Sequence, residues 1–423
     1  MAIERMKRFI NSTPNASATV FNVALKLKEN GYIELMEQEK WTEDIKGKGV
    51  FVIRGSSIIA ISLPKMGLKG FVGTLTHSDS PAFRIKANPE INNNGYTKLN
   101  VEPYGGPIYY SWLDKPLSIC GTVVDEYGDM YNVDTGDDLQ VFIPSQAIHM
   151  NREVNKKCEL NPQTDMLPVY LLDEQTKNSF DKQFLKAINN NRSKQDKIGR
   201  VLAKDICLYN PEKVKLIKLC NSNESLVLGP RLDNLISVWA SYESMIGKQS
   251  TSNAFVTAVF NSEEIGSATF DGANGTFLNS VLERICAVYE ENKYQIFANS
   301  SFLSIDAAHA IHPNAEKKSD PTNKVKLGKG IVIKHNDTYA TNIQIEAYIK
   351  GICVDEEIPW QDFYSRSDMK CGSTLGNISM STHGIPTQDI GVPMLAMHSA
   401  VETVSKNDCL TLLKFLEEFY KTY

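Results

Sequence analysis

A run of seven mostly apolar residues, 254–260, leads within three positions into two adjacent carboxylates, Glu263 and Glu264. A short run this rich in Val and Phe predicts a buried strand. Carboxylates at the edge of a core cost free energy unless they have a partner or a task. Successive strand residues point to opposite sides, so we expect different tasks, with one glutamate binding a cation and its neighbour moving a proton. A solvated strand end that opens a turn is the alternative.

The composition narrows the class of protein. A length of 423 residues suggests two or three domains, and a net charge of −5 argues against nucleic acid as the main partner. The first residues contain no apolar signal-peptide core, and no run approaches about 18 apolar residues, so we expect no membrane span and a cytoplasmic location. The eight cysteines form no C-x-x-C pair, which favours reduced, mostly buried thiols without a chemical role.

The order of apolar segments and turn residues predicts an α/β chain with an insertion. Residues 1–88 and 225–423 alternate helical and strand patterns, which predicts a central mixed sheet with helices on both faces. Residues 89–224 contain short strand candidates separated by Gly, Pro and Asp, which predicts an inserted β-rich domain. The main elements expected in the α/β part are a hairpin at 49–63, strands at 71–75, 254–260, 301–305 and 330–334, and helices at 13–30, 235–246, 276–289, 341–350 and 408–420.

Polar side chains follow several of the expected strands or precede the next helix. Ligand sites of open α/β sheets gather at the carboxyl ends of the strands, so these side chains are expected to meet there although they lie far apart in the sequence. The set comprises His77, Asp233, Glu263, Glu264, Asp306 and His398.

Two histidines and three carboxylates are suitable ligands for two zinc ions. The negative charges of Asp233, Glu264 and Asp306, with one bridging hydroxide, balance two divalent ions and leave Glu263 free as a general base. Asp79, two residues after the first histidine, can hold the imidazole in its ligating tautomer. Alternatively, Asp233 is an ordinary helix N-cap and the set is a coincidence among 50 acidic residues.

Several longer motifs resemble one known family. THSDSPAFRIK, GPRLDNL, NSEEIGSATFDGANGTF, SIDAAHAIHPN and GIPTQDIGVPMLAMHS occur in this order between residues 76 and 399. They resemble the aspartyl aminopeptidase and aminopeptidase I family of co-catalytic zinc metallopeptidases. The resemblance implies hydrolysis of the N-terminal residue from short peptides, with two Zn²⁺ ions per subunit that Co²⁺ or Mn²⁺ can replace.

The resemblance also implies a division of the metal ligands. His77 and Asp306 resemble the ligands of one zinc ion, and Glu264 and His398 resemble those of the other. Asp233 resembles the carboxylate that bridges both ions.

Two further residues of the motifs resemble parts of the catalytic machinery. Glu263 resembles the general base, and Asp79 resembles the residue behind the first histidine. In similar proteins the peptide bond after the bridging aspartate is cis, so we expect a cis bond between Asp233 and Asn234.

Substrate recognition and assembly are implied by three more positions. His149 resembles a histidine that enters the active site of a neighbouring subunit, and His309 resembles one near the scissile carbonyl; both are alternatively structural histidines. Lys334 resembles a residue that lines the pocket for the first side chain. The inserted domain is then expected to form dimers that assemble into a tetrahedral homododecamer.

The resemblance leaves the specificity open, because relatives prefer either acidic or neutral N-terminal residues. This chain carries Asn261 and Ser262 where many relatives carry Asp-Asn before the glutamates. A non-catalytic assembly scaffold and another two-zinc hydrolase remain the alternative functions.

Overall fold

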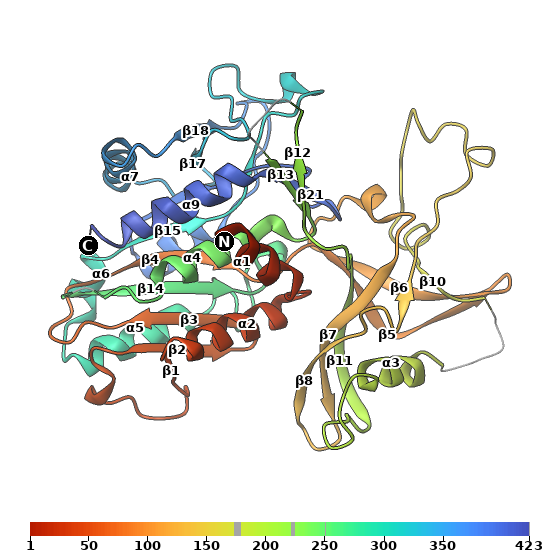
Figure 1. Ribbon diagram of the computed structural model, residues 1–423, viewed down its shortest axis with the longest axis horizontal. Coiled ribbons are helices and arrows are strands. Elements are labelled where there is room, and N and C mark those ends of the chain that lie inside the picture. Colours follow the sequence, from red (N-terminus) through yellow and green to blue (C-terminus); the bar gives the residue numbers. More distant parts are fainter. Residues whose placement is uncertain (173–178, 221–224, 250, 423) are drawn as a thin grey trace.

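The computed structural model describes residues 1–172, 179–220, 225–249 and 251–422, and it divides into two lobes (Figure 1). Within these residues, the main sheet of the larger lobe has nine strands in the order β1-β2-β3-β14-β4-β15-β19-β17-β18. The strands are β1 (Ile33–Glu34), β2 (Gly49–Arg54), β3 (Ser57–Ser62), β4 (Gly70–His77), β14 (Asn253–Phe260), β15 (Ser301–Ile305), β17 (Ile331–His335), β18 (Trp360–Tyr364) and β19 (Thr387–Gly391).

The centre of this sheet is parallel. β14 and β15 both pair in parallel with β4, and Phe260 at the end of β14 lies opposite His77 at the end of β4. The segments that follow these strands therefore leave the sheet at one edge. β3 runs antiparallel to β14, and β17 runs antiparallel to β19. The predicted mixed sheet is confirmed.

Helices cover both faces of the sheet, as the sequence predicts. Alternate residues of β14 enter different cores, with Phe255 and Val259 on one face and Val256 and Phe260 on the other. The first core includes side chains of α1 (Ala2–Asn11), α2 (Ala16–Glu29), α4 (Leu232–Met245), α7 (Ile343–Asp355) and α9 (Lys406–Phe419). The second core includes side chains of α5 (Phe277–Val288), α6 (Lys293–Ala298) and α8 (Leu375–His383).

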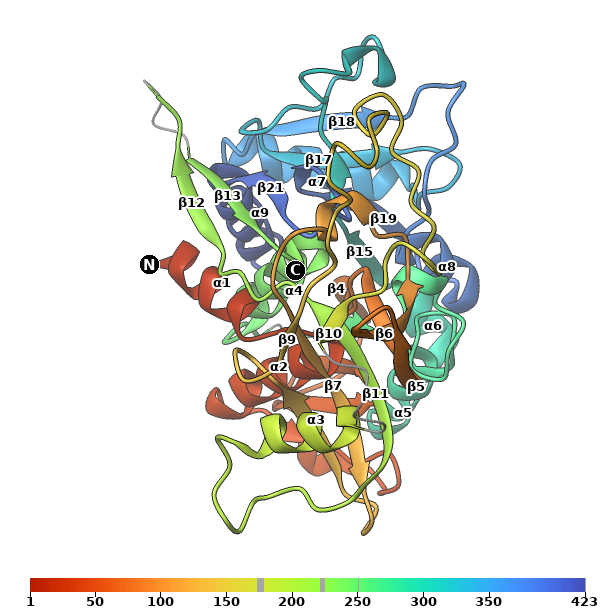
Figure 2. The same ribbon diagram turned by 90° about the vertical axis from the view of Figure 1, so that its right-hand side faces the viewer.

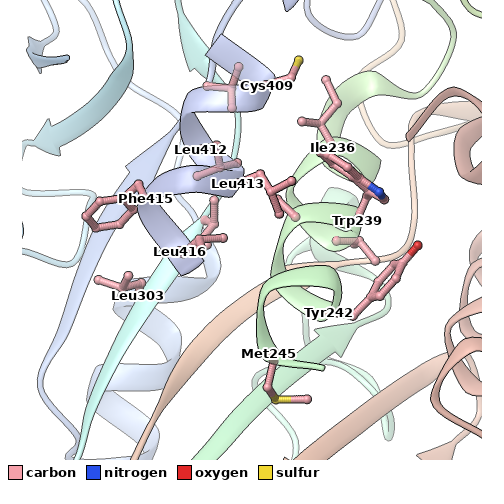
Figure 3. Close-up of a cluster of buried hydrophobic side chains, with 14 of the residues drawn as sticks. Ile236, Trp239, Tyr242, Met245, Leu303, Cys409, Leu412, Leu413, Phe415 and Leu416 are labelled. Atoms are coloured by element: carbon pink, nitrogen blue, oxygen red, sulfur yellow. The ribbon is translucent and has the colours of Figure 1, made fainter. Parts of the chain in front are cut away.

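The packing of α4 against α9 fixes the helix that begins beside Asp233. Trp239 and Leu412 are fully buried in the core that these two helices share, and Figure 3 shows Leu413 of α9 directed toward α4. Each fully buried side chain of this size contributes about 1.5–3 kcal/mol of transfer free energy. The position of Asp233 is therefore set by a large part of the core.

The sequence interpretation did not include α1. Met6, Phe9 and Ile10 of this helix are buried in the first core, and Phe9 packs edge-on against Tyr242 of α4 at 5.3 Å. Their i, i+3, i+4 spacing is the usual helical signal. The four charged residues among the first eight obscured it.

The smaller lobe is β-rich. Among the described residues its sheet has the order β10-β6-β5-β11-β7-β8, with β9 beside β7, and α3 (Ser179–Asn189) packs Phe180 and Phe184 into its core. The strands are β5 (Ala82–Asn93), β6 (Tyr96–Tyr104), β7 (Leu117–Asp125), β8 (Met130–Asp134), β9 (Gln140–Val141), β10 (Val169–Leu171) and β11 (Val201–Tyr209). The boundary expected at residue 89 falls inside β5. The division of the chain into two domains, 1–88 with 225–423 and 89–224, stays a prediction.

A third, smaller sheet connects the elements around the site. Its order is β12-β13-β21-β20-β16, formed by β12 (Lys215–Lys218), β13 (Ser225–Gly229), β16 (Ala308–His309), β20 (Pro393–Leu395) and β21 (Glu402–Ser405). β13, which lies beside β12 in Figure 2, leads into α4, and β20 leads into the segment with His398. No helix in the described part of the chain is both long and apolar enough to cross a membrane.

Candidate metal centre

Six of the predicted polar residues meet at the carboxyl edge of the main sheet. β4 ends at His77, and Glu263 follows β14 after a turn in which Ser262 takes a left-handed conformation with φ 65°. Asp306 directly follows β15, and Asp233 lies at the start of α4, where its backbone dihedral angles are not helical. We call the set the Asp233 cluster: His77, Asp233, Glu263, Glu264, Asp306 and His398.

The cluster contains two groups of three side chains that share Asp233. In the first group, His77 Nε2 lies 3.5 Å from Asp306 Oδ1 and 3.9 Å from Asp233 Oδ1. In the second group, His398 Nε2 lies 3.6 Å from Asp233 Oδ2 and 3.6 Å from Glu264 Oε2. Asp233 thus turns one oxygen toward each group, as a bridging carboxylate does.

The electrostatics of the cluster indicate missing positive charge. Asp233 Oδ1 and Glu264 Oε1 are buried and have no hydrogen-bond partner among the described residues. Burial, the largest effect, raises the pKa of Glu263 to about 7, and nearby Asp306 adds to this rise. Burial and a neighbouring carboxylate likewise raise the pKa of Asp233 and of Glu264. Histidine nitrogens and carboxylate oxygens in this arrangement fit zinc ions.

Asp79 organises the glutamates as well as the first histidine. The His77 ring donates from Nδ1 to the backbone oxygen of Asp79 at 3.0 Å, which leaves Nε2 available to a metal. The two carboxylate oxygens of Asp79 accept the backbone N–H groups of Glu263 and Glu264, each at 3.1 Å. Tyr104 donates its hydroxyl to the same carboxylate at 2.8 Å.

The sequence interpretation missed Glu402, which holds two of the candidate ligands. Its carboxylate accepts the backbone N–H of Asp233 at 3.0 Å and that of His398 at 2.7 Å, and the residue is 2% exposed. Burial and the neighbouring Asp233 raise the pKa of Glu402 to about 8. Its position four residues after a candidate ligand was the one available signal.

The smaller lobe also contributes to the site. His398 Nδ1 donates to the backbone oxygen of Gly106 at 3.2 Å. A Cβ at Gly105, where φ is 68°, would lie 3.0 Å from Cβ of Glu264, so the backbone of this lobe closely approaches the cluster. The sequence interpretation gave no role in the site to either glycine or to Tyr104, because strand patterns do not show which residues of another lobe reach the sheet edge.

Two of the three predicted substrate-binding residues lie near the cluster. Lys334 Nζ is 3.7 Å from Asp306 Oδ2, and the residue is 1% exposed. His309 is exposed on β16; partial desolvation and the charge of Lys334 lower the pKa of its imidazole. His149 lies on an exposed segment after β9, and no hydrogen bond or ion pair within the described residues joins it to the cluster.

The peptide bond between Asp233 and Asn234 is cis, as the resemblance implies. The Asn234 side chain donates to the backbone oxygen of Ile305 at 2.9 Å. This bond connects the start of α4 to the end of β15, next to Asp306.

Comparisons with known proteins agree with this geometry. The sequence profile of the family described as "Aminopeptidase I zinc metalloprotease (M18)" matches residues 9–420. The chain is 36% identical over 426 residues to a probable M18 family aminopeptidase 2 of Clostridium acetobutylicum, covering 97% of this chain and 96% of that relative. A chain in the cryo-EM structure of the Ape4 and Nbr1 complex superposes with a TM-score of 0.92 at 31% identity, covering 100% of this chain and 85% of that one. The structure of the mApe1 dodecamer of S. cerevisiae shares the fold, with a TM-score of 0.82 at 21% identity, covering 99% of this chain and 96% of that one.

A match of this length defines the class of protein, a metallo-aminopeptidase that hydrolyses peptide bonds. The chain belongs to the aminopeptidase I family of zinc metalloproteases, M18.

Proposed function

We propose that this protein is a binuclear zinc aminopeptidase that removes the N-terminal residue of short peptides. The observation that carries the proposal is the shared carboxylate, because Asp233 turns one oxygen to His77 and the other to His398. A carboxylate shared by two groups of ligands could help to hold two cations, and a paired-metal site would supply activated water and a polarised carbonyl. His77 and Asp306 would hold one zinc ion, and Glu264 and His398 the other. Co²⁺ and Mn²⁺ accept the same nitrogen and oxygen donors.

Glu263 is assigned as the general base, and the geometry supports this role. When bound, the two ions lower the pKa of a water molecule and polarise the scissile carbonyl. Glu263 accepts a proton from the attacking water and returns it to the leaving nitrogen as the peptide bond breaks. Its backbone N–H is anchored on Asp79, so the carboxylate is held beside the ligands. His309, exposed at the same edge, is assigned to the scissile carbonyl.

Lys334 is assigned to the pocket for the first side chain. A buried ammonium group favours an acidic side chain by charge pairing. Asp306 at 3.7 Å and the nearby Asp389 offset part of its charge, so a neutral first residue is also accepted. Rates on Asp-, Glu-, Leu- and Met-derived chromogenic substrates test the specificity. Lys334→Met should reduce the rates on the acidic substrates more than the rates on the neutral ones.

We infer that the smaller lobe forms dimers and that these assemble into a tetrahedral dodecamer. The related mApe1 of S. cerevisiae is a dodecamer. In such an assembly His149, exposed here, would reach a neighbouring site, and only short or unfolded peptides would enter. Sedimentation velocity measures the assembly. His149→Ala should lower kcat and leave the zinc content unchanged.

The eight free cysteines support a cytoplasmic location, where thiols stay reduced.

The sharpest test of the mechanism compares two neighbouring glutamates. Glu263→Gln should retain both zinc ions and lose about 10²–10⁴-fold in kcat, because a general base contributes that much. Glu264→Gln should lose one zinc ion per chain as well as activity. Zinc content by atomic emission and kcat on one substrate separate the two roles. An active Glu263→Gln enzyme would overturn the assignment of the base.

The substrate panel also separates the two other functions. If the protein is a non-catalytic scaffold, it should hydrolyse none of the aminoacyl substrates even when it holds both zinc ions. A different two-zinc hydrolase would act on carboxyl-terminal residues or on sugars and leave the aminoacyl substrates intact.

A further inference from the structure

Cys120 and Cys207 face each other across two adjacent strands of the smaller lobe. The two residues are direct partners in the antiparallel pairing of β7 with β11, which lie side by side in Figure 1. Directly opposite residues of an antiparallel pair have Cα atoms about 4.5–5.5 Å apart, within the range that a disulfide bond spans. Their side chains also share one face of the sheet. The backbone is therefore already in a geometry that a disulfide accepts.

The side chains place the two sulfur atoms in contact. Cys120 Sγ lies 3.7 Å from Cys207 Sγ. Formation of a disulfide would bring them to about 2.05 Å, a movement that small side-chain rotations provide. Of the eight free cysteines in the described part of the chain, Cys120 and Cys207 are the pair whose sulfur atoms lie in contact.

The two thiols differ in access. Cys120 is fully buried, and its Sγ donates to the backbone oxygen of Pro14 at 3.5 Å. Cys207 is half-buried and lines an open cavity of about 150 Å³ between the lobes. A small reagent in the cavity would therefore meet Cys207 first. Cys120 lies behind it and is shielded from direct attack.

The surroundings contain a fixed positive charge. The Arg231 guanidinium lies over the ring of Tyr209 at 5.3 Å, two residues from Cys207 on the same face of β11. Burial raises the pKa of the Cys120 thiol, the adjacent Cys207 raises it further, and the charge of Arg231 opposes the rise. The buried thiol is therefore slow to react alone and suited to react with a sulfur already in contact.

We propose that Cys120 and Cys207 form a reversible disulfide bond when the protein meets a small-molecule disulfide such as oxidised glutathione. The Cys207 thiolate attacks one glutathione sulfur, the S–S bond of glutathione breaks, and one glutathione thiolate leaves. The Cys120 thiolate then attacks the Cys207 sulfur and releases the second glutathione. Two protein thiols lose two electrons and two protons, and oxidised glutathione becomes two molecules of reduced glutathione.

The bond would stabilise the smaller lobe. It closes a loop of 87 residues, which restricts the unfolded chain. We therefore expect the oxidised protein to melt several degrees higher than the reduced protein, and dithiothreitol to reverse the difference. This modification requires neither a bound metal ion nor peptidase activity, so it does not depend on the proposed function.

Peptide mapping tests the proposal in the full-length, metal-loaded protein. The native protein is equilibrated with oxidised glutathione, denatured, alkylated and digested. We expect the peptides that contain Cys120 and Cys207 to be linked to each other and to carry no glutathione. The exposed Cys158 and Cys220 report that the reagent is active, because they should carry glutathione under the same conditions.

Variants identify the order of attack. Cys120→Ala should trap one glutathione on Cys207, because the resolving thiol is absent. Cys353→Ala removes a buried cysteine of the larger lobe and should leave the linkage intact. Free, alkylated Cys120 and Cys207 in a sample whose Cys158 and Cys220 carry glutathione would overturn the proposal. Linkage of Cys207 to several different cysteines would also overturn it, since that result indicates exchange in unfolded protein.

Discussion

The Asp233 cluster and a second cluster around His335 contain the same kinds of side chains, but they balance their charges differently. The His335 cluster consists of His335, Glu346, Lys350 and Asp362, on β17, β18 and α7. Ligand atoms of its histidine and two carboxylates lie within 4.8 Å of one another, as they do in each group of the Asp233 cluster. Proximity alone would therefore predict a metal ion at both places.

The difference is a lysine that contacts both carboxylates of the His335 cluster. Lys350 Nζ lies 2.8 Å from Glu346 Oε1 and 2.9 Å from Asp362 Oδ1, and His335 Nε2 lies 2.8 Å from Asp362 Oδ1. Burial alone would raise the pKa of Asp362, but hydrogen bonds from Lys350 and His335 outweigh it and lower the pKa. In the Asp233 cluster the pKa of Asp233 and of both glutamates is raised instead. Asp306 is the exception in the Asp233 cluster: burial opposes the shift, but the charge of Lys334 at 3.7 Å and a hydrogen bond from His77 lower its pKa. The other three carboxylates of that cluster have no lysine or arginine partner among the described residues, which suits them to a metal ion.

The largest expected contrast comes from one aspartate in each cluster. Asp233→Asn removes the shared carboxylate, so both zinc positions should lose affinity and kcat/KM should fall by roughly 10³-fold or more, equivalent to several kcal/mol of transition-state stabilisation. Asp362→Asn makes the same chemical change in the His335 cluster and should leave zinc content and kcat/KM unchanged. Atomic emission and steady-state rates measure both. A loss of zinc in Asp362→Asn would show that the His335 cluster also binds metal.

A substitution of Glu402 should have a smaller effect on the metal affinity of the Asp233 cluster. Glu402→Gln keeps the size of the side chain but turns an amide N–H₂ toward one of the two backbone donors, Asp233 N–H or His398 N–H. Outer groups that orient metal ligands typically contribute 10–100-fold to affinity or activity, so zinc affinity in chelator competition should weaken by about that factor. Glu346→Gln is the matched change in the His335 cluster. Equal zinc affinity in the two variants would show that Glu402 does not position the metal ligands.

The main features of the fold could be predicted because the sequence pattern reports them directly. Residues 254–260 alternate between two cores, and the parallel register places Phe260 opposite His77. Polar residues directly after such strands must share an edge of the sheet, so Glu263 and Asp306 could be expected near His77. Asp233 was found through the helix that it precedes.

The remaining parts of the site could not be predicted from strand and helix patterns. Glu402 acts on backbone N–H groups, one of them 169 residues away, and no periodicity reports that contact. Tyr104 belongs to the other lobe and reaches Asp79 only because the lobes pack together. The start of β5 at Ala82 was missed because exposed polar residues follow its buried Phe83 and Ile85.

Removal of the lysine should make the His335 cluster resemble the Asp233 cluster. Lys350→Met leaves His335 and two carboxylates without a nearby ammonium group, so the variant should bind one more zinc ion per chain than the unsubstituted protein in equilibrium dialysis. The lost ion pairs should lower stability by about 1 kcal/mol, because these side chains are about a third exposed. Lys293→Met removes a comparable ion pair with Glu283 that has no histidine, and it should bind no additional zinc. If Lys350→Met also binds none, missing positive charge is insufficient to create a site.

The smallest expected effect is the pH dependence of the His335 cluster. The lowered pKa of Asp362 gives a stabilisation that is present above the ordinary aspartate value of about 3.9 and is lost as the pH falls through the folded value. The pKa of Lys350 is raised despite its burial, because Glu346 and Asp362 bond to it, so its contribution is present below about 10.4 and is lost as the pH rises through the folded value. The melting temperatures of the unsubstituted protein and Lys350→Met should therefore differ most between these limits, by the equivalent of about 1 kcal/mol or less, and converge beyond them. A difference that persists unchanged below pH 3 would mean that Lys350 stabilises the fold through the packing of its methylene groups, and that charge balance contributes little to this cluster.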